Sequence, residues 1–232
     1  MDRLNKGSQN YFGRLLAAAC FMPFAASVVY FFVLDGSFLA KWVYLAAKII
    51  ILLLPVYVLG ISKIKEFPKA LKPDRQDILL GLLSALFIFI LFYLLLHTPL
   101  WRFIEEGKTA VISKVNNFNI GRHFLLYSLI ISFVHSMVEE YYWRWFVFGG
   151  LKKFFRGGAA HIMAALAFSL HHFVVCVYYF PLITAVILTF AVFCGGMLFS
   201  TLYNRKGLLP GAWIAHAAAD ICIFYAGVLL LK

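Results

Sequence analysis

The sequence predicts an all-α membrane protein: a polytopic bundle of about seven transmembrane helices, with one further helix at the membrane interface. Hydrophobic residues make up 63% of the 232 residues and charged residues only 13%, and a soluble domain carries about twice that charged fraction. Apolar runs long enough to cross a hydrocarbon core recur along the whole chain. Basic residues gather in the short segments between these runs, as they do in membrane proteins.

Seven stretches reach the roughly 20 mostly apolar residues that a membrane-crossing helix needs. Backbone polar groups in lipid must be satisfied within their own segment, so each stretch is predicted to be helical. The fourth is interrupted by Glu139, Glu140 and Arg144. The predicted spans are Leu15–Leu34, Phe38–Ile61, Ile78–His97, His123–Phe148, Ala159–Tyr178, Leu182–Tyr203 and Leu208–Leu231.

Two segments between the spans have a distinct character. From Trp101 to Gly121, apolar residues recur at helical spacing, which predicts one amphipathic helix at the outer interface. The basic, proline-containing connector from Lys63 to Asp77 is predicted to be a solvated cytoplasmic loop. No internal repeat or linker interrupts the chain, so residues 1–232 are predicted to form a single integral membrane domain.

The positive charge indicates orientation. With seven spans, Lys and Arg favour the side of the N-terminus by about two to one, which places the N-terminus in the cytoplasm and the C-terminus outside. The small size and the lack of eukaryotic targeting signals favour a prokaryotic plasma membrane. No phosphate-binding loop or zinc-finger spacing accompanies the net charge of +11, so no nucleic-acid partner is expected. The four cysteines are isolated and predict neither disulfides nor a thiolate metal site.

Charged residues within a span cost roughly 2.5–3.5 kcal/mol each on insertion, so they usually mark function. In the fourth span, Glu140 and Arg144 are four residues apart and can form an ion pair. Glu139 points about 100° away, on the face that also carries His135. The pair Glu140–Arg144 is interpreted as structural, and His135 is either a partner of Glu139 or a satisfied core histidine.

The fifth and seventh spans carry further polar groups at the same helical spacing. Phe168 and His172 share one helix face, and His216 and Asp220 share another. His171 points away from His172 and is interpreted as a packing or lining residue. The acidic dipeptide Glu105–Glu106 has no arginine at the matching spacing and is interpreted as a solvated pair.

Depth in the membrane is a second, independent test of these groups. At ~1.5 Å per residue, Glu139, His172 and His216 lie about 20, 24 and 15 Å from basic residues at the cytoplasmic ends of their helices. Three spans therefore bring a carboxylate and imidazoles to overlapping depths. One carboxylate beside one imidazole is the smallest set of side chains that can activate a water molecule as a nucleophile.

Three motifs in this order resemble a known family. Residues 139–144 (EEYYWR) match EExxxR, residues 168–172 (FSLHH) match FxxxH, and residues 216–220 (HAAAD) come close to HxxxN. Together they resemble the CPBP family, the CAAX protease and bacteriocin-processing group that includes Rce1-type prenyl-protein endopeptidases. The motifs lie within residues 130–225, and the first three spans contribute nothing to the resemblance.

The resemblance implies specific roles. Glu139 corresponds to the family's glutamate base, assisted by His172 with a water between them, and His216 corresponds to the oxyanion-stabilising position. Asp220 departs from the commoner Asn, whose amide can donate a hydrogen bond to an oxyanion as an ionised Asp cannot. Either Asp220 is protonated, or it only orients His216.

The predicted function is therefore intramembrane endopeptidase activity on a membrane-associated protein or peptide, either a prenylated CAAX protein or a leader-type substrate. No cofactor is expected. A metal-assisted variant, with His172, His216 and a glutamate as ligands, ranks lower because the HExxH signature is absent. A proton-coupled transporter and a non-catalytic scaffold are the alternatives, although no inverted repeat supports transport.

Overall fold

The computed structural model describes residues 6–117 and 121–231, and every regular element in those two ranges is a helix. Six helices are long and apolar enough to cross a membrane. This confirms the predicted all-α transmembrane bundle. The six are α1 (Lys6–Val28, continued by the π-helical η1, Val29–Val33), α2 (Phe38–Ile64, interrupted at Gly60), α4 (Arg75–Leu96), α10 (Ala159–Tyr179), α11 (Leu182–Lys206) and α12 (Pro210–Leu230).

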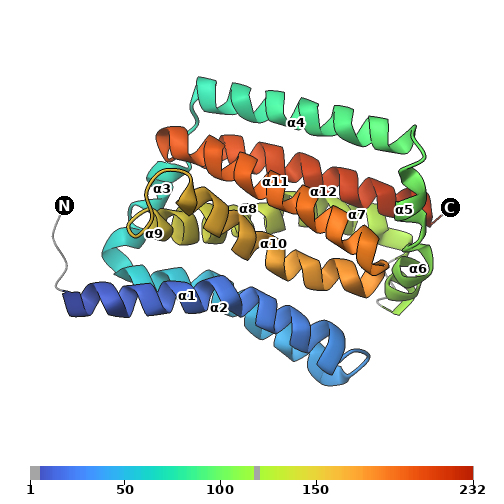
Figure 1. Cartoon of the computed structure of the whole chain (residues 1–232), viewed down its shortest axis with the longest axis horizontal. Helices are drawn as coiled ribbons and strands as arrows, with labels where there is room; N and C mark the ends of the chain where they lie inside the picture. The colour runs from blue at the N-terminus through green and yellow to red at the C-terminus, as the bar shows by residue number, and fades with distance from the viewer. Residues whose placement is uncertain (1–5, 118–120, 232) are drawn as a thin grey trace.

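The long helices run along the long axis of the molecule (Figure 1). In this view α4 lies along one side, α1 and α2 along the other, and the remaining helices lie between them. Within the bundle, α10 packs along α11, α12 packs along α4, and α1 packs against α10. The start of α1 and the end of α12 lie at opposite ends of the molecule.

The fourth predicted span is a continuous series of short helical pieces. It comprises η2 (Gly121–His123), α7 (Phe124–Ile130), η3 (Ile131–His135), α8 (Ser136–Glu140), η4 (Tyr141–Phe148) and α9 (Gly149–Leu151), with η3 and η4 π-helical. This series qualifies as a seventh span only when it is taken together with residues 101–117. The angle between these two parts is 99°. Nearly all of η4 is buried among the other helices. Because the bundle shields this segment, its charged side chains need not face lipid.

The predicted single interfacial helix is wrong, because two short helices occupy the segment. They are α5 (Trp101–Glu105) and α6 (Lys108–Asn117), and residues 118–120 of the expected helix lie outside the described residues. The break falls at Gly107, where a Cβ atom would run into the ring of Phe180. Glu106 is also not simply solvated, since its carboxylate accepts a hydrogen bond of 2.7 Å from Thr184 Oγ1.

The predicted cytoplasmic connector contains a short helix, α3 (Phe67–Ala70). Its Phe67 ring packs against the rings of Tyr141 and Trp145 in η4, with centroids 4.9 and 5.3 Å apart. The carbonyl of Ala70 accepts a hydrogen bond of 2.8 Å from the Leu209 N–H. This connector is therefore partly docked on the bundle.

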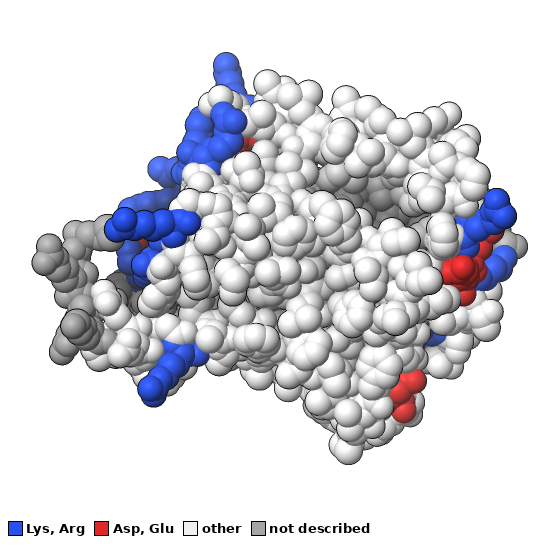
Figure 2. All heavy atoms as spheres, viewed as in Figure 1, with Lys and Arg blue, Asp and Glu red and all other residues white. Residues whose placement is uncertain are grey.

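A wide band of the visible surface carries no Lys, Arg, Asp or Glu (Figure 2). Lys and Arg side chains gather at the end of the molecule where α1 begins, and both signs of charge occur at the opposite end. An uncharged band between two charged ends is the surface that a bilayer requires.

Two contacts hold the outer helices α1 and α4 against the helices that lie between them. In α1, Pro23 has no N–H to offer the carbonyl of Ala19, and the Tyr142 hydroxyl donates a hydrogen bond of 2.8 Å to that carbonyl instead. At the start of α12, the Gly211 N–H donates a hydrogen bond of 2.8 Å to Asp77 Oδ2 of α4. There α4 and α12 touch backbone to backbone, since a Cβ on Gly81 would lie 2.6 Å from the Gly211 oxygen.

Candidate active site

Glu139 and Glu140 are the centre of the polar cluster. Both lie on α8 and are almost completely buried, with 5% and 0% of their surfaces exposed. One residue step turns about 100° around a helix, so the two carboxylates enter different surroundings. Each therefore has its own set of partners.

Glu140 forms the predicted ion pair with Arg144, with Oε1 3.0 Å from Nη1. The Arg144 guanidinium lies between the rings of Phe168 and Phe199, 4.5 and 4.9 Å from their centroids. Stacking on aromatic faces suits a guanidinium in a desolvated site. Glu140 Oε1 is also 2.7 Å from Nδ1 of His216 on α12, a contact that the helix-face argument did not predict.

This contact orients His216. Nδ1 of His216 donates to the carboxylate oxygen that also pairs with Arg144, and the ring presents Nε2 to the rest of the cluster. His216 Nε2 lies 3.7 Å from Glu139 Oε2 and 3.8 Å from Asp220 Oδ1. Both separations exceed a direct hydrogen bond. The predicted neighbours His216 and Asp220 are thus brought together beside Glu139.

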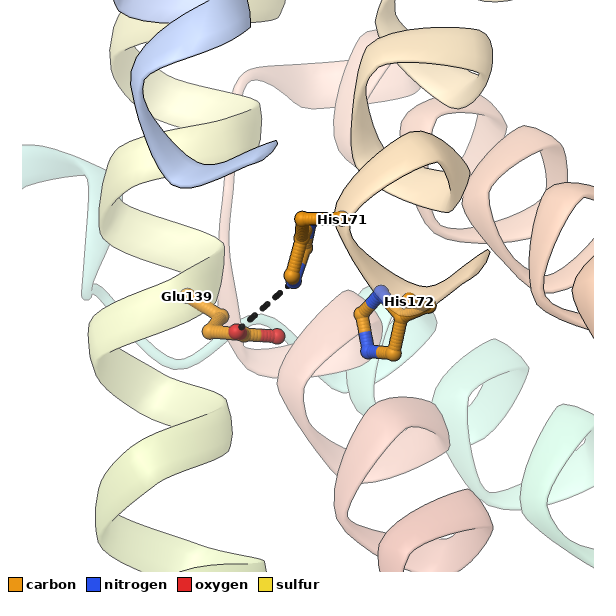
Figure 3. A group of neighbouring side chains, drawn as sticks. All are labelled: Glu139, His171 and His172. Carbon is orange, nitrogen blue, oxygen red and sulfur yellow. Dashed lines mark ion pairs between the residues drawn. The ribbon is translucent and has the colours of Figure 1, made fainter. Parts of the chain in front are cut away.

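The other oxygen of Glu139 faces two more imidazoles. Glu139 Oε1 lies 3.2 Å from Nε2 of His135 and 3.6 Å from Nε2 of His171, and Figure 3 shows His171 pointing at it. His171 also stacks on the Trp143 ring, with centroids 5.4 Å apart and planes inclined by 5°. It was interpreted as a packing or lining residue, and it both packs and reaches the carboxylate.

His172 lies beside Glu139 without forming an ion pair with it (Figure 3). Its Nδ1 donates a hydrogen bond of 2.9 Å to the carbonyl of Phe168, so the lone pair of the neutral ring is on Nε2. The ligand atoms of Glu139, His171 and His172 lie within 4.8 Å of one another, so these three side chains could hold a metal ion. This possible metal-binding set contains His171, whereas the metal-assisted variant considered from the sequence used His216 as a ligand.

Lys48 of α2 is a polar residue that the sequence analysis missed. Its Nζ lies 3.3 Å from Nδ1 of His135, on the far side of that ring from Glu139. The sequence did contain a signal, since Lys48 interrupts the apolar run of the second span. Phe199, stacked on the His216 ring at 4.9 Å, had no such signal, because one phenylalanine among many in apolar spans is not distinctive.

The comparisons with known proteins identify the segment that carries this cluster. Residues 121–222 match the family model described as type II CAAX prenyl endopeptidase Rce1-like. This segment is Rce1-like. The match confirms the resemblance drawn from the three motifs, and the family named is one of membrane proteases that hydrolyse peptide bonds. Neither a curated protein nor a solved structure matches the chain.

The Rce1-like segment contains every residue that the sequence analysis proposed for the site. It begins nine residues before the expected start at 130 and ends three before the expected end at 225. Lys48 and its helix lie outside it. The proposed residues within it are His135, Glu139, Glu140, Arg144, Phe168, His172, His216 and Asp220.

Proposed function

We propose that this protein is an intramembrane endopeptidase in which Glu139 activates a water molecule for attack on a peptide bond of a membrane-associated protein. The observation that carries the proposal is the buried Glu139 carboxylate within reach of imidazoles from three elements, η3, α10 and α12. All of these imidazoles lie in the Rce1-like segment. A carboxylate held among nitrogen donors can accept a proton from water at the moment of attack.

In this mechanism the Glu139 carboxylate takes a proton from the water while the water oxygen bonds to the carbonyl carbon. His172 assists on the same side, since its Nε2 carries the lone pair that can orient the water. The proton held by Glu139 then passes to the leaving amine as the C–N bond breaks. The products are a new carboxylate and a new amine, and no acyl-enzyme forms.

The oxyanion of the tetrahedral intermediate is assigned to His216 in its imidazolium form, in which Nε2 as well as Nδ1 carries a proton and Nε2 projects towards the space between Glu139 and Asp220. Glu140 and Arg144 act behind it, because the 2.7 Å hydrogen bond from His216 Nδ1 fixes the ring. A donor fixed before the reaction stabilises developing charge without reorganisation. Asp220, 3.8 Å from Nε2, either donates as a neutral acid or orients the imidazole.

The substrate class follows from the family alone. The family's name describes prenyl endopeptidases acting on CAAX sequences, so a prenylated C-terminal peptide is the first substrate to try. A leader-type peptide that lies in the membrane is the alternative. Both would reach a buried site from within the bilayer.

A metal-assisted variant of the same hydrolysis has one observation in its favour, the grouping of Glu139, His171 and His172. The hydrogen bond from His172 Nδ1 to a backbone carbonyl is the arrangement that typically orients a metal-binding histidine. A bound metal would polarise the scissile carbonyl or acidify a water. Metal analysis of the purified protein and loss of cleavage with a chelator, restored by one added metal, would favour this variant.

The test uses the full chain in proteoliposomes with a farnesylated peptide that ends in a CAAX sequence, and its unprenylated form. Glu139→Gln should lower kcat by roughly 10²–10⁴-fold, the scale of a lost general base, while the melting temperature stays close to wild type. Hydrolysis in ¹⁸O-labelled water should place the label in the new carboxyl group. Mass spectrometry of the products measures both.

Glu105→Gln is the matched control, because Glu105 belongs to the acidic dipeptide outside the cluster and should leave cleavage unchanged. Equal cleavage by wild type and Glu139→Gln would remove Glu139 from the mechanism. If wild type cleaves neither peptide, protein termini are compared in membranes from cells making wild type or Glu139→Gln. Identical termini in those two membranes would favour a scaffold.

A further inference from the structure

Lys48 lies near the middle of a membrane-spanning helix, ten residues after Phe38 and twelve before Gly60. A charged side chain at this depth is costly and usually marks a functional site. Among the described residues, no carboxylate forms an ion pair with its ammonium group. Glu139 and Asp220 attract it only through space. The nearest polar partner is His135.

The contact between Lys48 and His135 is directional. In its charged form Lys48 has hydrogen-bond donors and no acceptor, so across the 3.3 Å contact Nζ donates to His135 Nδ1. A neutral imidazole that accepts at Nδ1 carries its proton on Nε2. That nitrogen lies 3.2 Å from Glu139 Oε1. The three side chains therefore lie in series, with a hydrogen bond between Lys48 and His135 and a contact of 3.2 Å between His135 and Glu139.

We propose that Lys48 is a positioning residue for the proposed protease: it fixes the tautomer of His135 and thereby holds the Glu139 carboxylate for water activation. The inference rests on the proposed function. It assigns a role to α2, which lies outside the Rce1-like segment. It also gives His135 a role, which is to connect Lys48 with Glu139.

Two features of the surroundings support this role. His135 is 30% exposed, so without a partner at Nδ1 its ring could turn away from Glu139. Lys48 is held over the Tyr44 ring, 5.2 Å from its centroid, which restrains the long side chain on the side facing His135. The other groups around Glu139 approach from α10 and α12 and do not contact Nδ1 of His135. They are His171, His172, His216 and Asp220.

The first experiment reads the imidazole directly and needs no substrate. The full chain is labelled with ¹⁵N-histidine in proteoliposomes, and the His135 signals are assigned by their loss in His135→Gln. Wild type should show a neutral His135 ring with its proton on Nε2. Lys48→Met should add a population protonated at Nδ1, because the ammonium no longer occupies that position. Lys41→Met, an exposed site on the same helix, should leave the spectrum unchanged.

The second experiment separates positioning from substrate binding. With the farnesylated CAAX peptide, Lys48→Met should lower kcat by about tenfold or more with little change in KM, the pattern of an interaction that acts on the chemical step. Lys48→Arg keeps a donor and a positive charge and should recover most of the loss. Lys48→Met removes a charge from a lipid-embedded helix, so its insertion is not impaired.

The proposal is overturned if the His135 signals are the same in wild type and Lys48→Met, or if wild type carries its proton on Nδ1. It is also overturned if Lys48→Met raises KM and leaves kcat unchanged, which would make Lys48 a substrate-binding residue. Failure of the peptide to be cleaved by wild type would count against the proposed substrate alone. The ¹⁵N measurement would still decide the role of Lys48.

Discussion

At the scale of single residues, the two neighbouring carboxylates of α8 differ in what surrounds them. Glu140 is held by a guanidinium and an imidazole in direct contact. Glu139 has its closest imidazole at 3.2 Å and others at 3.6 and 3.7 Å. Both partners of Glu140 hold the same oxygen, Oε1, at short distances, whereas the imidazoles around Glu139 contact both of its oxygens at longer distances, which leaves room for a water to bridge them. The geometry therefore favours Glu139 over Glu140 as the base.

Asp220 gives the sharpest test at this scale, because it departs from the Asn of the HxxxN motif that residues 216–220 resemble. Asp220→Asn supplies an amide donor at 3.8 Å from His216 Nε2 whatever the protonation of the site. We expect this variant to cleave at least as fast as wild type. Asp220→Ala should lose roughly 10²–10³-fold in kcat, the cost of one oxyanion donor. Initial rates with the farnesylated peptide measure both variants.

If Asp220→Asn were as impaired as Asp220→Ala, the carboxylate itself would be needed to orient His216. Melting temperatures of the two variants must match that of wild type for the rates to be compared.

The site residues that sequence could predict are those on one helix face. The spacing of Glu140 and Arg144 required only a regular helix, and the structure has that ion pair. The approach of His171 to Glu139 depends on how α10 packs against α8, which no spacing within α10 reports. Lys48 was visible as a charge in an apolar run, yet its partner lies 87 residues away. The three motifs predicted the segment, and packing between helices decides the contacts.

At the scale of elements, the contact between α4 and α12 positions His216 and Asp220, because α12 carries His216 five residues after Gly211. A Cβ on Gly81 would lie 2.6 Å from the Gly211 oxygen, which is backbone and cannot swing aside. We expect Gly81→Ala to separate the helices and lower stability by about 1–3 kcal/mol, the usual cost of overpacking. Thermal melting in detergent and cleavage of the peptide should both decline.

Gly158→Ala is the matched control for this variant, since nothing lies within 4 Å of a Cβ placed there. A wild-type melting temperature for Gly81→Ala would mean that the two helices can move apart without cost.

A second prediction concerns the start of α4. Asp74 caps this helix by accepting from the Asp77 N–H, and it accepts a hydrogen bond of 2.7 Å from Lys206 at the end of α11. The Lys206 hydrogen bond and that N–H hold the pKa of Asp74 below its ordinary value. Because the pKa of Asp74 is lower in the folded state than in the unfolded state, its charge stabilises the fold at pH values above the unfolded pKa, about 4. This stabilisation is lost as the pH falls through the lower pKa of the folded state.

Asp74→Asn keeps an oxygen to cap the helix and removes the charge. Its melting temperature should therefore lie below that of wild type at neutral pH, by a small amount because the pair is exposed. The difference should disappear as the pH falls below roughly 4. A difference that stays constant from about pH 7 to about pH 3, across the ordinary pKa of an Asp, would show that charge plays no part.

The ends of the helices could be predicted well where only the need to span the apolar part of the membrane sets them. The predicted span Phe38–Ile61 corresponds to the apolar part of α2, and Leu182–Tyr203 ends three residues before α11 does. The break between α5 and α6 could not be predicted, because Gly107 at the break packs closely against the ring of Phe180, 73 residues further along the chain. The π-helical turns of η3 and η4 likewise leave no mark in the periodicity of apolar residues.

At the scale of the whole molecule, the beginning of α1 and the end of α12 lie at opposite ends of the long axis (Figure 1). The Lys- and Arg-rich end is the one where α1 begins (Figure 2), and such ends face the cytoplasm. Alkaline phosphatase fused after Lys232 should therefore be active, and green fluorescent protein at that position should be dark. Reporters inserted after Lys72 should show the reverse pattern, and equal results at both positions would contradict this orientation.

The proline in α1 has a consequence for the order in which the protein is made. The carbonyl of Ala19 finds its donor, the Tyr142 hydroxyl, 123 residues later in the chain. Ribosomal synthesis delivers α1 to the bilayer before η4, so α1 is inserted with one backbone acceptor still unsatisfied, a costly state in lipid. This backbone acceptor of α1 is thus satisfied only when the Rce1-like segment packs beside it, and the late hydrogen bond stabilises the correct assembly of the two parts.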